Sequence, residues 1–434
     1  MEIPYAKYVL DNGLEVIIHE DHRLPLVAVN LWYHVGSKNE RPGLTGFAHL
    51  FEHLMFEGSE HYDRGYFHPL QEAGAALNGS TSADRTNYWE VVPTGALELA
   101  LWMESDRMGY LLPALTEAKF DKQRDVVLNE RRQNYENRPY GLANMAIVDA
   151  LFPPDHPYCW LTIGRTEDLR AATLENATAF FRAYYHPGNA SLALAGDIEP
   201  EAGLALANDY FGGIERGPAI ERPSAGAVMH GERRLLLEDS IELPRLYLSW
   251  HSPAMFKGGD AECDLTADML GVGKSSRLYR ALVYERRIAT EVTSIQNSRE
   301  LSGFFQVIAT SAPGHTLAEL EQVITEEIER FTADGPTASE LERSLAQAEA
   351  HFVYRVQTVG GFGGKSDQLN AYNVFLGDPG YFERDLGRYR QATLDGIRET
   401  ARRSLRRDAR VALSVVPRGQ RALAVPASDE VVMS

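Results

Sequence analysis

Two histidines and a glutamate stand close together in the run His49-Leu50-Phe51-Glu52-His53. On a helix, positions i, i+3 and i+4 share one face, so both imidazoles and the carboxylate would point at one spot. Neutral histidines suit zinc, and a carboxylate beside them can take a proton from zinc-bound water. The order H-x-x-E-H reverses the H-E-x-x-H motif of many zinc proteases. The motif therefore indicates zinc-dependent hydrolysis.

The residues that flank the motif are almost all apolar, which predicts a buried helix. Thr45 is the expected N-cap of this helix, and Gly58 is the expected stop signal. Buried ionisable groups are costly unless they are paired or bound to metal. The alternative is a chance pattern of two hydrogen-bonded core histidines and a salt bridge.

A catalytic zinc site normally needs a third protein ligand. The best candidate is Glu130, near the end of the helical segment 120–132. It follows Val127 by three positions and Val126 by four, which places it on the apolar side of the helix. An ordinary surface charge is the alternative, because two arginines follow directly, and the spacing alone leaves both interpretations open.

With Glu130 placed 77 residues after His53, the sequence resembles the pitrilysin family of zinc metallopeptidases over nearly the whole chain. That family includes insulin-degrading enzyme and the mitochondrial processing peptidase, and it has bacterial members like the latter. The resemblance implies that His49, His53 and Glu130 are the ligands of one zinc ion per chain. It also implies that Glu52 is the general base.

A second block that resembles the family runs from Asn78 to Tyr88. In the family this block forms an edge strand beside the metal, and an extended peptide can pair with the free edge of such a strand. The resemblance therefore implies that the substrate binds along residues Asn78, Gly79, Ser80 and Thr81. A polar hairpin without a binding role is the alternative.

One departure from the family pattern lies in the helix that carries the expected third ligand. Many relatives have a second glutamate one heptad before it, whereas this chain has Gln123. On the same helix face as Glu130, Gln123 can still hydrogen-bond to a metal ligand.

A second departure lies in the segment 282–292. Single-chain relatives carry there an Arg and a Tyr that hold the substrate, and here Tyr284 and Thr290 stand near those positions. Arg286 and Arg287 are candidate substitutes for the Arg, but no Tyr follows them. We therefore expect a heterodimer, in which a homologous subunit without metal supplies the Arg/Tyr pair. A homodimer is the alternative.

An internal repeat relates the two halves of the chain. A shift of 215 residues places the metal motif on Asp264-Leu265-Thr266-Ala267-Asp268, which keeps one leucine and none of the histidines. We infer a duplicated domain in which only the first copy kept the metal chemistry. The predicted fold class is α+β, with two tandem, structurally similar α/β-sandwich domains that form a clamshell.

The predicted domain limits are a metal-bearing domain at 1–211, a linker at 212–231 that is rich in Gly, Pro and Ala, and a homologous domain without metal at 232–434. Strand patterns support this division. They lie at 14–19, 26–32, 190–195, 234–238, 245–250 and 411–416.

Composition excludes several classes of function. The net charge of −18 argues against nucleic acid as a partner. No apolar run is long enough for a membrane span, and no signal peptide is evident, so the cytoplasm is the default expectation, or the periplasm if a leader was removed. Cys159 and Cys263 are too few for a thiolate zinc site, and we expect both to be free.

The leading hypothesis is a zinc-dependent endopeptidase that acts on peptides or unfolded polypeptides, as the catalytic subunit of a heterodimer. The alternative is a non-catalytic structural or assembly subunit of a pitrilysin-like complex. All four motif residues are present here, whereas structural members of the family have typically lost part of the motif.

Overall fold

The computed structural model describes residues 2–226, 229 and 231–433. It contains two mixed six-stranded sheets, one from each half of the sequence. The strands of the first sheet are β1 (Ala6–Val9), β2 (Glu15–Glu20), β3 (Leu26–Tyr33), β4 (Ala76–Thr81), β5 (Thr86–Pro93) and β6 (Ala190–Gly196). Those of the second sheet are β7 (Arg233–Asp239), β8 (Arg245–Ser252), β9 (Ala289–Asn297), β10 (Gly303–Ser311), β11 (Val411–Pro417) and β12 (Asp429–Glu430). All six strands expected from sequence patterns are confirmed.

The helices follow the order of the two halves. The first half contains α1 (Phe47–Leu54), α2 (Phe67–Glu72), α3 (Leu97–Ala114), α4 (Glu117–Arg131), α5 (Ala143–Leu151), α6 (Thr166–Ala171), α7 (Leu174–Tyr184) and α8 (Pro200–Phe211). The second half contains α9 (Asp260–Gly271), α10 (Leu317–Asp334), α11 (Ala338–Arg355), α12 (Lys365–Leu376), α13 (Phe382–Arg390) and α14 (Leu394–Ser404). None of the helices in the described part of the chain combines the length and apolar character that a membrane crossing requires.

Five strands of each sheet follow the same order, which confirms that the two halves are structurally similar, as the sequence predicts. The orders are β1-β2-β6-β3-β5-β4 and β12-β7-β11-β8-β10-β9. In each sheet one central pair is parallel, β2 with β6 and β7 with β11, and the hairpin at one end is antiparallel. The sheets differ at the other end, where β1 is antiparallel to β2 and β12 is parallel to β7.

The chain divides into two compact units, each of which contains one sheet. The first comprises Met1–Asn129, Leu161–Pro223 and Ala350–Arg384, and the second comprises Glu130–Trp160, Ser224–Glu349 and Asp385–Ser434. Each unit therefore borrows a segment from the other half of the sequence. The division of the sequence into contiguous domains at 212–231 stays a prediction.

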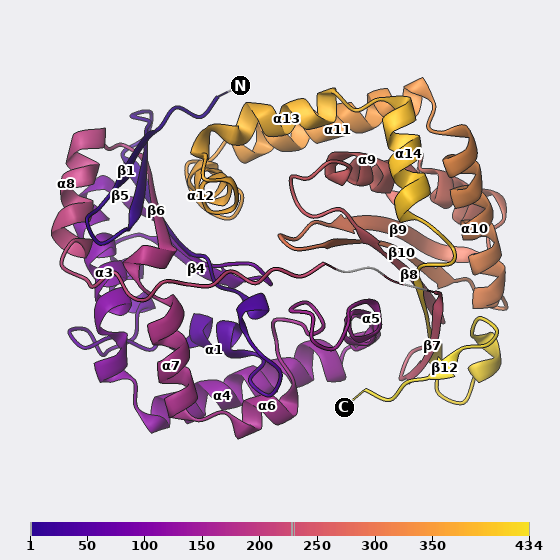
Figure 1. The fold of residues 1–434 in the computed structure, drawn as a ribbon, viewed down its shortest axis with the longest axis horizontal. Coiled ribbons are helices and arrows are strands. Elements are labelled where there is room, and N and C mark those ends of the chain that lie inside the picture. The colour runs from indigo at the N-terminus through magenta and orange to yellow at the C-terminus, as the bar shows by residue number, and fades with distance from the viewer. Residues whose placement is uncertain (1, 227–228, 230, 434) are drawn as a thin grey trace. The chain divides into compact units, whose positions relative to one another are not determined.

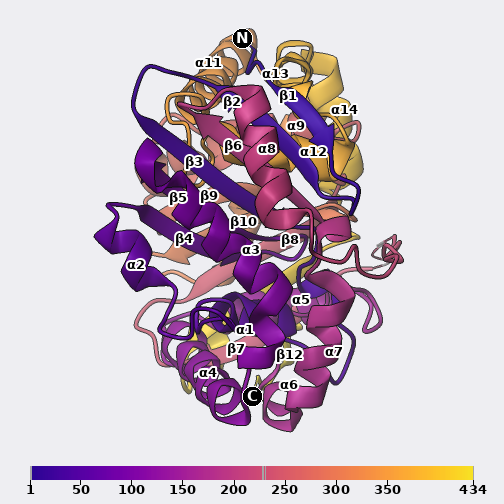
Figure 2. The ribbon, with the colours of Figure 1, turned by 90° about the vertical axis from the view of Figure 1, so that its left-hand side faces the viewer.

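In the first unit, helices cover both faces of the sheet. Helices α3 and α8 pack on one face, and the borrowed helix α12 packs on the other, over β3 and β6. Figure 2 shows α3 and α8 in front of the strands and β4 at a free edge of the sheet, with α2 beside it. The edge at β4 is therefore open to pairing with another strand.

Helix α12 is attached to the first sheet largely by buried polar side chains. The Asp367 carboxylate accepts hydrogen bonds from Trp32 Nε1 at 2.9 Å and from Asn87 Nδ2 at 3.2 Å. Asn370 Nδ2 donates to the carbonyl oxygen of Asn30 at 2.8 Å. These bonds satisfy groups that would be costly to leave unpaired inside the unit.

The second unit repeats this arrangement. Helices α9, α10 and α14 cover one face of its sheet, and the borrowed helix α5 packs on β8 and β11 (Figure 1). Both cysteines are buried, and neither forms a disulfide bond, as expected. The confirmed fold class is thus α+β, with two similar α/β halves.

Candidate metal centre

Helix α1 carries the motif, and its apolar residues anchor it in the first unit. Phe47, Leu50, Phe51 and Leu54 are buried, whereas His49, Glu52 and His53 are half-buried. The helix therefore presents the three motif residues on its one partly open face. The imidazole rings of His49 and His53 lie 4.8 Å apart between centroids and are nearly perpendicular.

The N-terminus of α1 is held by carboxylates, and this differs from the sequence expectation. The N-cap is Gly46 rather than Thr45, and the Glu40 carboxylate accepts from the amides of Gly46 at 2.9 Å and Ala48 at 2.8 Å. The Thr45 hydroxyl instead donates to Asp168 at 2.7 Å. A negative charge at a helix N-terminus is stabilising because it meets free amides and the positive end of the helix dipole.

Gly46 is required by the backbone at this position. Its φ of 91° lies in the left-handed region, and a Cβ there would lie 2.9 Å from Leu169 Cδ2 and 3.1 Å from the carbonyl oxygen of Ile163. A larger residue would therefore push α1 away from the segment that follows α5.

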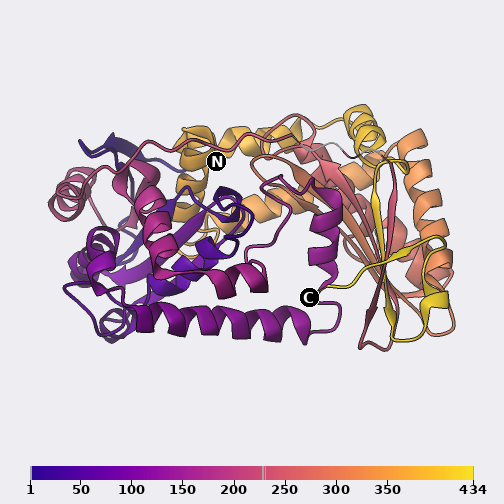
Figure 3. The same ribbon diagram turned by 60° about the horizontal axis from the view of Figure 1, so that its bottom comes forward.

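Helix α4 brings the third residue to this face. It is continuous over Glu117–Arg131, and Figure 3 shows it as a long purple helix. Gln123 and Val127 are buried and Glu130 is half-buried, so these three positions mark the inner face. Val126, by contrast, is 39% exposed. The boundary between the units falls just before Glu130, which stays on the last turn of the same helix.

The geometry brings together one ligand atom from each of three predicted residues. Atoms of His49, His53 and Glu130 all lie within 4.8 Å of one another. Such a set of two imidazoles and one carboxylate matches a catalytic zinc site with one open coordination position. Burial, and secondarily the neighbouring His53, lower the pKa of His49 to about 4. His49 is therefore neutral at pH 7, which is the form that binds metal.

Glu52 is held from the edge strand of the first sheet. The hydroxyl of Thr81, the last residue of β4, donates to Glu52 Oε2 at 2.6 Å. The Glu52 carboxylate on α1 is thus hydrogen-bonded to the end of β4.

The four residues predicted to bind substrate lie together on β4. Gly79 packs against aromatic rings, because a Cβ there would lie 3.1 Å from both Phe56 and Tyr88. The Ser80 hydroxyl donates to Asn87 Oδ1 at 2.6 Å, and Asn78 Oδ1 accepts from the amide of Gly79 at 2.8 Å. Their role in binding a peptide stays a prediction.

The side-chain amide nitrogen of Gln123 is directed to Glu57 and not to Glu130. Its Nε2 donates to Glu57 Oε1, and Lys122 Nζ donates to the same carboxylate at 2.9 Å. Glu57 lies three residues after the end of α1, so this contact ties α4 to α1. Glu40 and Glu57 were missed from the sequence, because neither stands at a spacing that marks a cap or a ligand.

A buried cluster supports the sheet under this site. The Arg107 guanidinium lies over the rings of Tyr66 and Tyr88 at 3.8 and 4.1 Å and pairs with Glu104. Burial and the nearby Glu104 carboxylate raise the pKa of Glu90 well above its usual range. The cluster fixes Tyr88 and hence the packing of Gly79.

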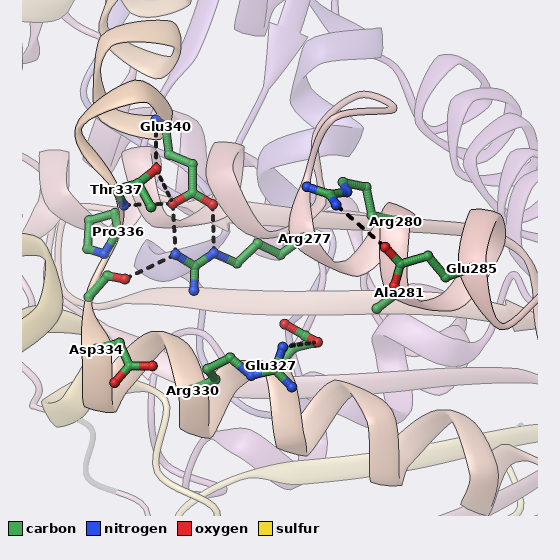
Figure 4. A pocket seen from close by; sticks show the side chains of 11 residues that line it. Arg277, Arg280, Ala281, Glu285, Glu327, Arg330, Asp334, Pro336, Thr337 and Glu340 are labelled. Atoms are coloured by element: carbon green, nitrogen blue, oxygen red, sulfur yellow. Dashed lines mark hydrogen bonds and ion pairs between the residues drawn. The ribbon is translucent and has the colours of Figure 1, made fainter.

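A pocket in the second unit has a different character (Figure 4). Arg277 donates to both oxygens of Glu340, at 2.6 and 2.7 Å, and Arg330 donates to Glu327 at 3.0 Å. Because these charged side chains pair with one another, this pocket differs from the group formed by His49, His53 and Glu130.

The segment 282–292, where the family's Arg/Tyr pair was sought, also lies in the second unit. Tyr284 is 74% exposed, and Arg286 pairs with Glu326 at 3.5 Å. The Thr290 hydroxyl donates to the carbonyl oxygen of Thr310 at 3.3 Å, across to β10.

Comparison with known protein families gives two matches along the chain. Residues 15–152 match the Insulinase family (Peptidase family M16), and residues 171–348 match the Peptidase M16 inactive domain. The first match contains α1 and α4, and the second contains α9, where the histidine motif is degenerate.

Proteins with similar sequences and structures support the same family. Zinc protease PqqE of Helicobacter pylori is 28% identical over 82% of this chain and 80% of its own length. The uncharacterized zinc protease YmxG of Bacillus subtilis is 23% identical over 94% of this chain and 97% of its own length. The crystal structure of a protease from Helicobacter pylori superposes with a TM-score of 0.88 at 25% identity, over 95% of this chain and all of that one. With both halves matched in order, the chain belongs to the pitrilysin family of peptidases, M16.

Proposed function

We propose that this chain is a zinc-dependent endopeptidase that hydrolyses peptides or unfolded polypeptides. The observation that carries the proposal is the convergence of His49, His53 and Glu130 within 4.8 Å, with Glu52 on the same helix face. The names of similar zinc proteases support the choice of metal and reaction class.

The proposed roles follow from the chemistry of each side chain. His49, His53 and Glu130 would hold the metal, which, when bound, acidifies a water molecule and polarises the carbonyl group of the scissile bond. The Glu52 carboxylate would take the proton of the attacking water and deliver it to the leaving amine. The free edge of β4 would align the peptide backbone beside these groups.

Metal analysis and a peptide digest test this proposal. Protein purified without chelator should hold about one zinc per chain, as three ligands and one open position imply. Removal of the metal with a chelator should abolish peptide hydrolysis, and added zinc should restore it. A protein that binds zinc but cleaves no peptide, alone or with co-purified partners, would instead favour a non-catalytic assembly role.

We further propose that the chain works as the catalytic subunit of a heterodimer. The segment 282–292 lacks an Arg/Tyr pair of the expected kind. Within it, Tyr284 is exposed, Arg286 pairs with Glu326, and Thr290 donates to Thr310. A homologous subunit without metal would supply that pair. Assay of the chain alone and with proteins co-purified from the native host distinguishes the cases. Full peptidase activity of the isolated monomer contradicts the heterodimer.

A further inference from the structure

Thr81 makes a direct contact with the proposed general base. Its hydroxyl donates to Glu52 Oε2 at 2.6 Å, across 29 positions of sequence. Hydrogen bonds to a carboxylate are shorter and stronger than those between neutral groups. This bond joins the helix of the metal motif to the strand that is proposed to receive the substrate.

The pleat of β4 decides which side chains face the metal motif. Successive residues of a strand point to opposite faces, so Thr81 and Gly79 share one face. Gly79 meets Phe56, just beyond α1, and Thr81 meets Glu52 on α1. Ser80 faces the other way, where its hydroxyl contacts Asn87. Among the four residues predicted to bind substrate, Thr81 is therefore the one whose side chain binds Glu52.

The hairpin that follows Thr81 holds the hydroxyl in place. Ser82 Oγ accepts from the amides of Asp84 and Arg85, both at 3.1 Å, which closes the turn between β4 and β5. The Asp84 carboxylate pairs with the buried Lys38 at 3.3 Å. The Thr86 hydroxyl donates to the carbonyl oxygen of Val35 at 2.9 Å. The turn is thus tied to the segment that leads into α1.

Arg85 adds charge beside this contact. Its guanidinium donates to Ser80 at both the carbonyl oxygen and the hydroxyl, at 2.9 and 2.7 Å. The carboxylates of Asp367, Glu52 and Asp84 all lie near enough to act on it.

We propose that Thr81 is a positioning residue that orients the Glu52 carboxylate for proton transfer. The inference rests on the proposed function of Glu52 as a general base. A glutamate side chain has several rotatable bonds, and a hydroxyl on one oxygen restricts both its rotamer and the plane of the carboxylate. The backbone of Thr81 belongs to β4, the strand that would pair with a peptide. The same strand would therefore bind the substrate and orient the Glu52 carboxylate.

Three single substitutions test this role. Thr81→Val keeps the shape of the side chain and removes the donor, and Thr81→Ser keeps the donor. Thr86→Val is the matched control, because it removes a hydroxyl bond of similar length from the same hairpin without touching Glu52. For each variant, kcat and KM for a peptide substrate, zinc content and thermal unfolding are measured.

The expected result separates orientation from stability. Thr81→Val should lower kcat by roughly 10- to 100-fold, as loss of a hydrogen bond to a charged group implies. Its KM and zinc content should stay near those of the wild type, and Thr81→Ser should recover most of kcat. Thr86→Val should lower the unfolding temperature without this selective loss of kcat.

A second readout does not depend on activity. Crystal structures of the metal-free wild type and Thr81→Val should show that Glu52 leaves the end of β4 in the variant. Unchanged kcat in Thr81→Val, an equal loss in Thr86→Val, no recovery in Thr81→Ser, or an unmoved Glu52 each contradicts the role of Thr81. If the wild type cleaves no peptide, the proposed function fails, and the orientation of Glu52 in the two crystal structures still decides the positioning role.

Discussion

The Glu40 carboxylate accepts a hydrogen bond of 2.8 Å from the amide of Ala48, the residue directly before the first histidine of the motif. With the bond to Gly46, it occupies two of the free amides that open α1. The first turn of α1 is therefore fixed by a side chain from the preceding loop, and loss of this cap would loosen the turn that carries His49.

We expect Glu40→Ala to destabilise the metal-free protein by about 1–2 kcal/mol, because it leaves buried helix amides without an acceptor. Zinc affinity should fall as well, since the first turn must then be ordered by the metal. Urea unfolding and zinc titration measure the two effects. Glu40→Gln keeps one of the two acceptor oxygens and should lose less in both; equal losses in the two variants would contradict a capping role.

Glu52→Gln should abolish peptide hydrolysis and retain the metal. The amide fills the same space but accepts no proton, so we expect a loss of at least about 100-fold in kcat. Zinc content, measured by elemental analysis, should stay near one per chain, because Glu52 is not among the three converging ligands. Loss of zinc in this variant would mean that Glu52 takes part in binding the metal.

Two adjacent residues of α4 offer a matched comparison. Gln123 and Lys122 both donate to Glu57, but Gln123 is buried, whereas the Lys122 side chain is 64% exposed. Gln123→Ala should weaken zinc binding by roughly 10-fold, because it frees α4 from the end of α1. Lys122→Ala should change it little, because exposed ion pairs contribute under about 1 kcal/mol. Competition with a chromogenic chelator gives both affinities.

Asp264, at the position of His49 in the degenerate copy of the motif, predicts a pH dependence. Burial, with the Asp260 carboxylate second, raises its pKa from the ordinary 3.8 to about 7. The Tyr389 hydroxyl donates to it at 2.5 Å. Because the folded-state pKa lies above the unfolded one, the stability that Asp264 contributes is fully present below pH 3.8 and is lost as the pH rises through about 7.

Asp264→Asn removes this titration. The free energy of unfolding of the wild type should fall relative to the variant between about pH 5 and pH 8, by an amount on the order of 2 kcal/mol. Urea unfolding at a series of pH values measures the difference. A difference that stays constant across this range would show that Asp264 is ionised throughout.

The sequence by itself determined the local elements and the chemical types at the candidate site. Alternation of apolar and polar residues and runs of β-branched residues predicted six strands that the structure confirms. Such predictions succeed because burial of one or both faces of a strand determines the type of side chain at each position. The motif His49–His53 was readable because the helical period alone places its three polar groups on one face. The degenerate copy at Asp264 likewise pointed to two similar halves.

Only the tertiary structure decided which distant residues meet. Glu40 and Thr81 contact α1, and Glu57 contacts α4, through bonds that depend on how strands and helices pack, and no periodic pattern encodes such partners. The same holds for α5 and α12, each of which packs on the sheet of the other half of the sequence. Sequence patterns report which face of an element is buried, but the partner of that face is chosen by packing between elements far apart in the chain.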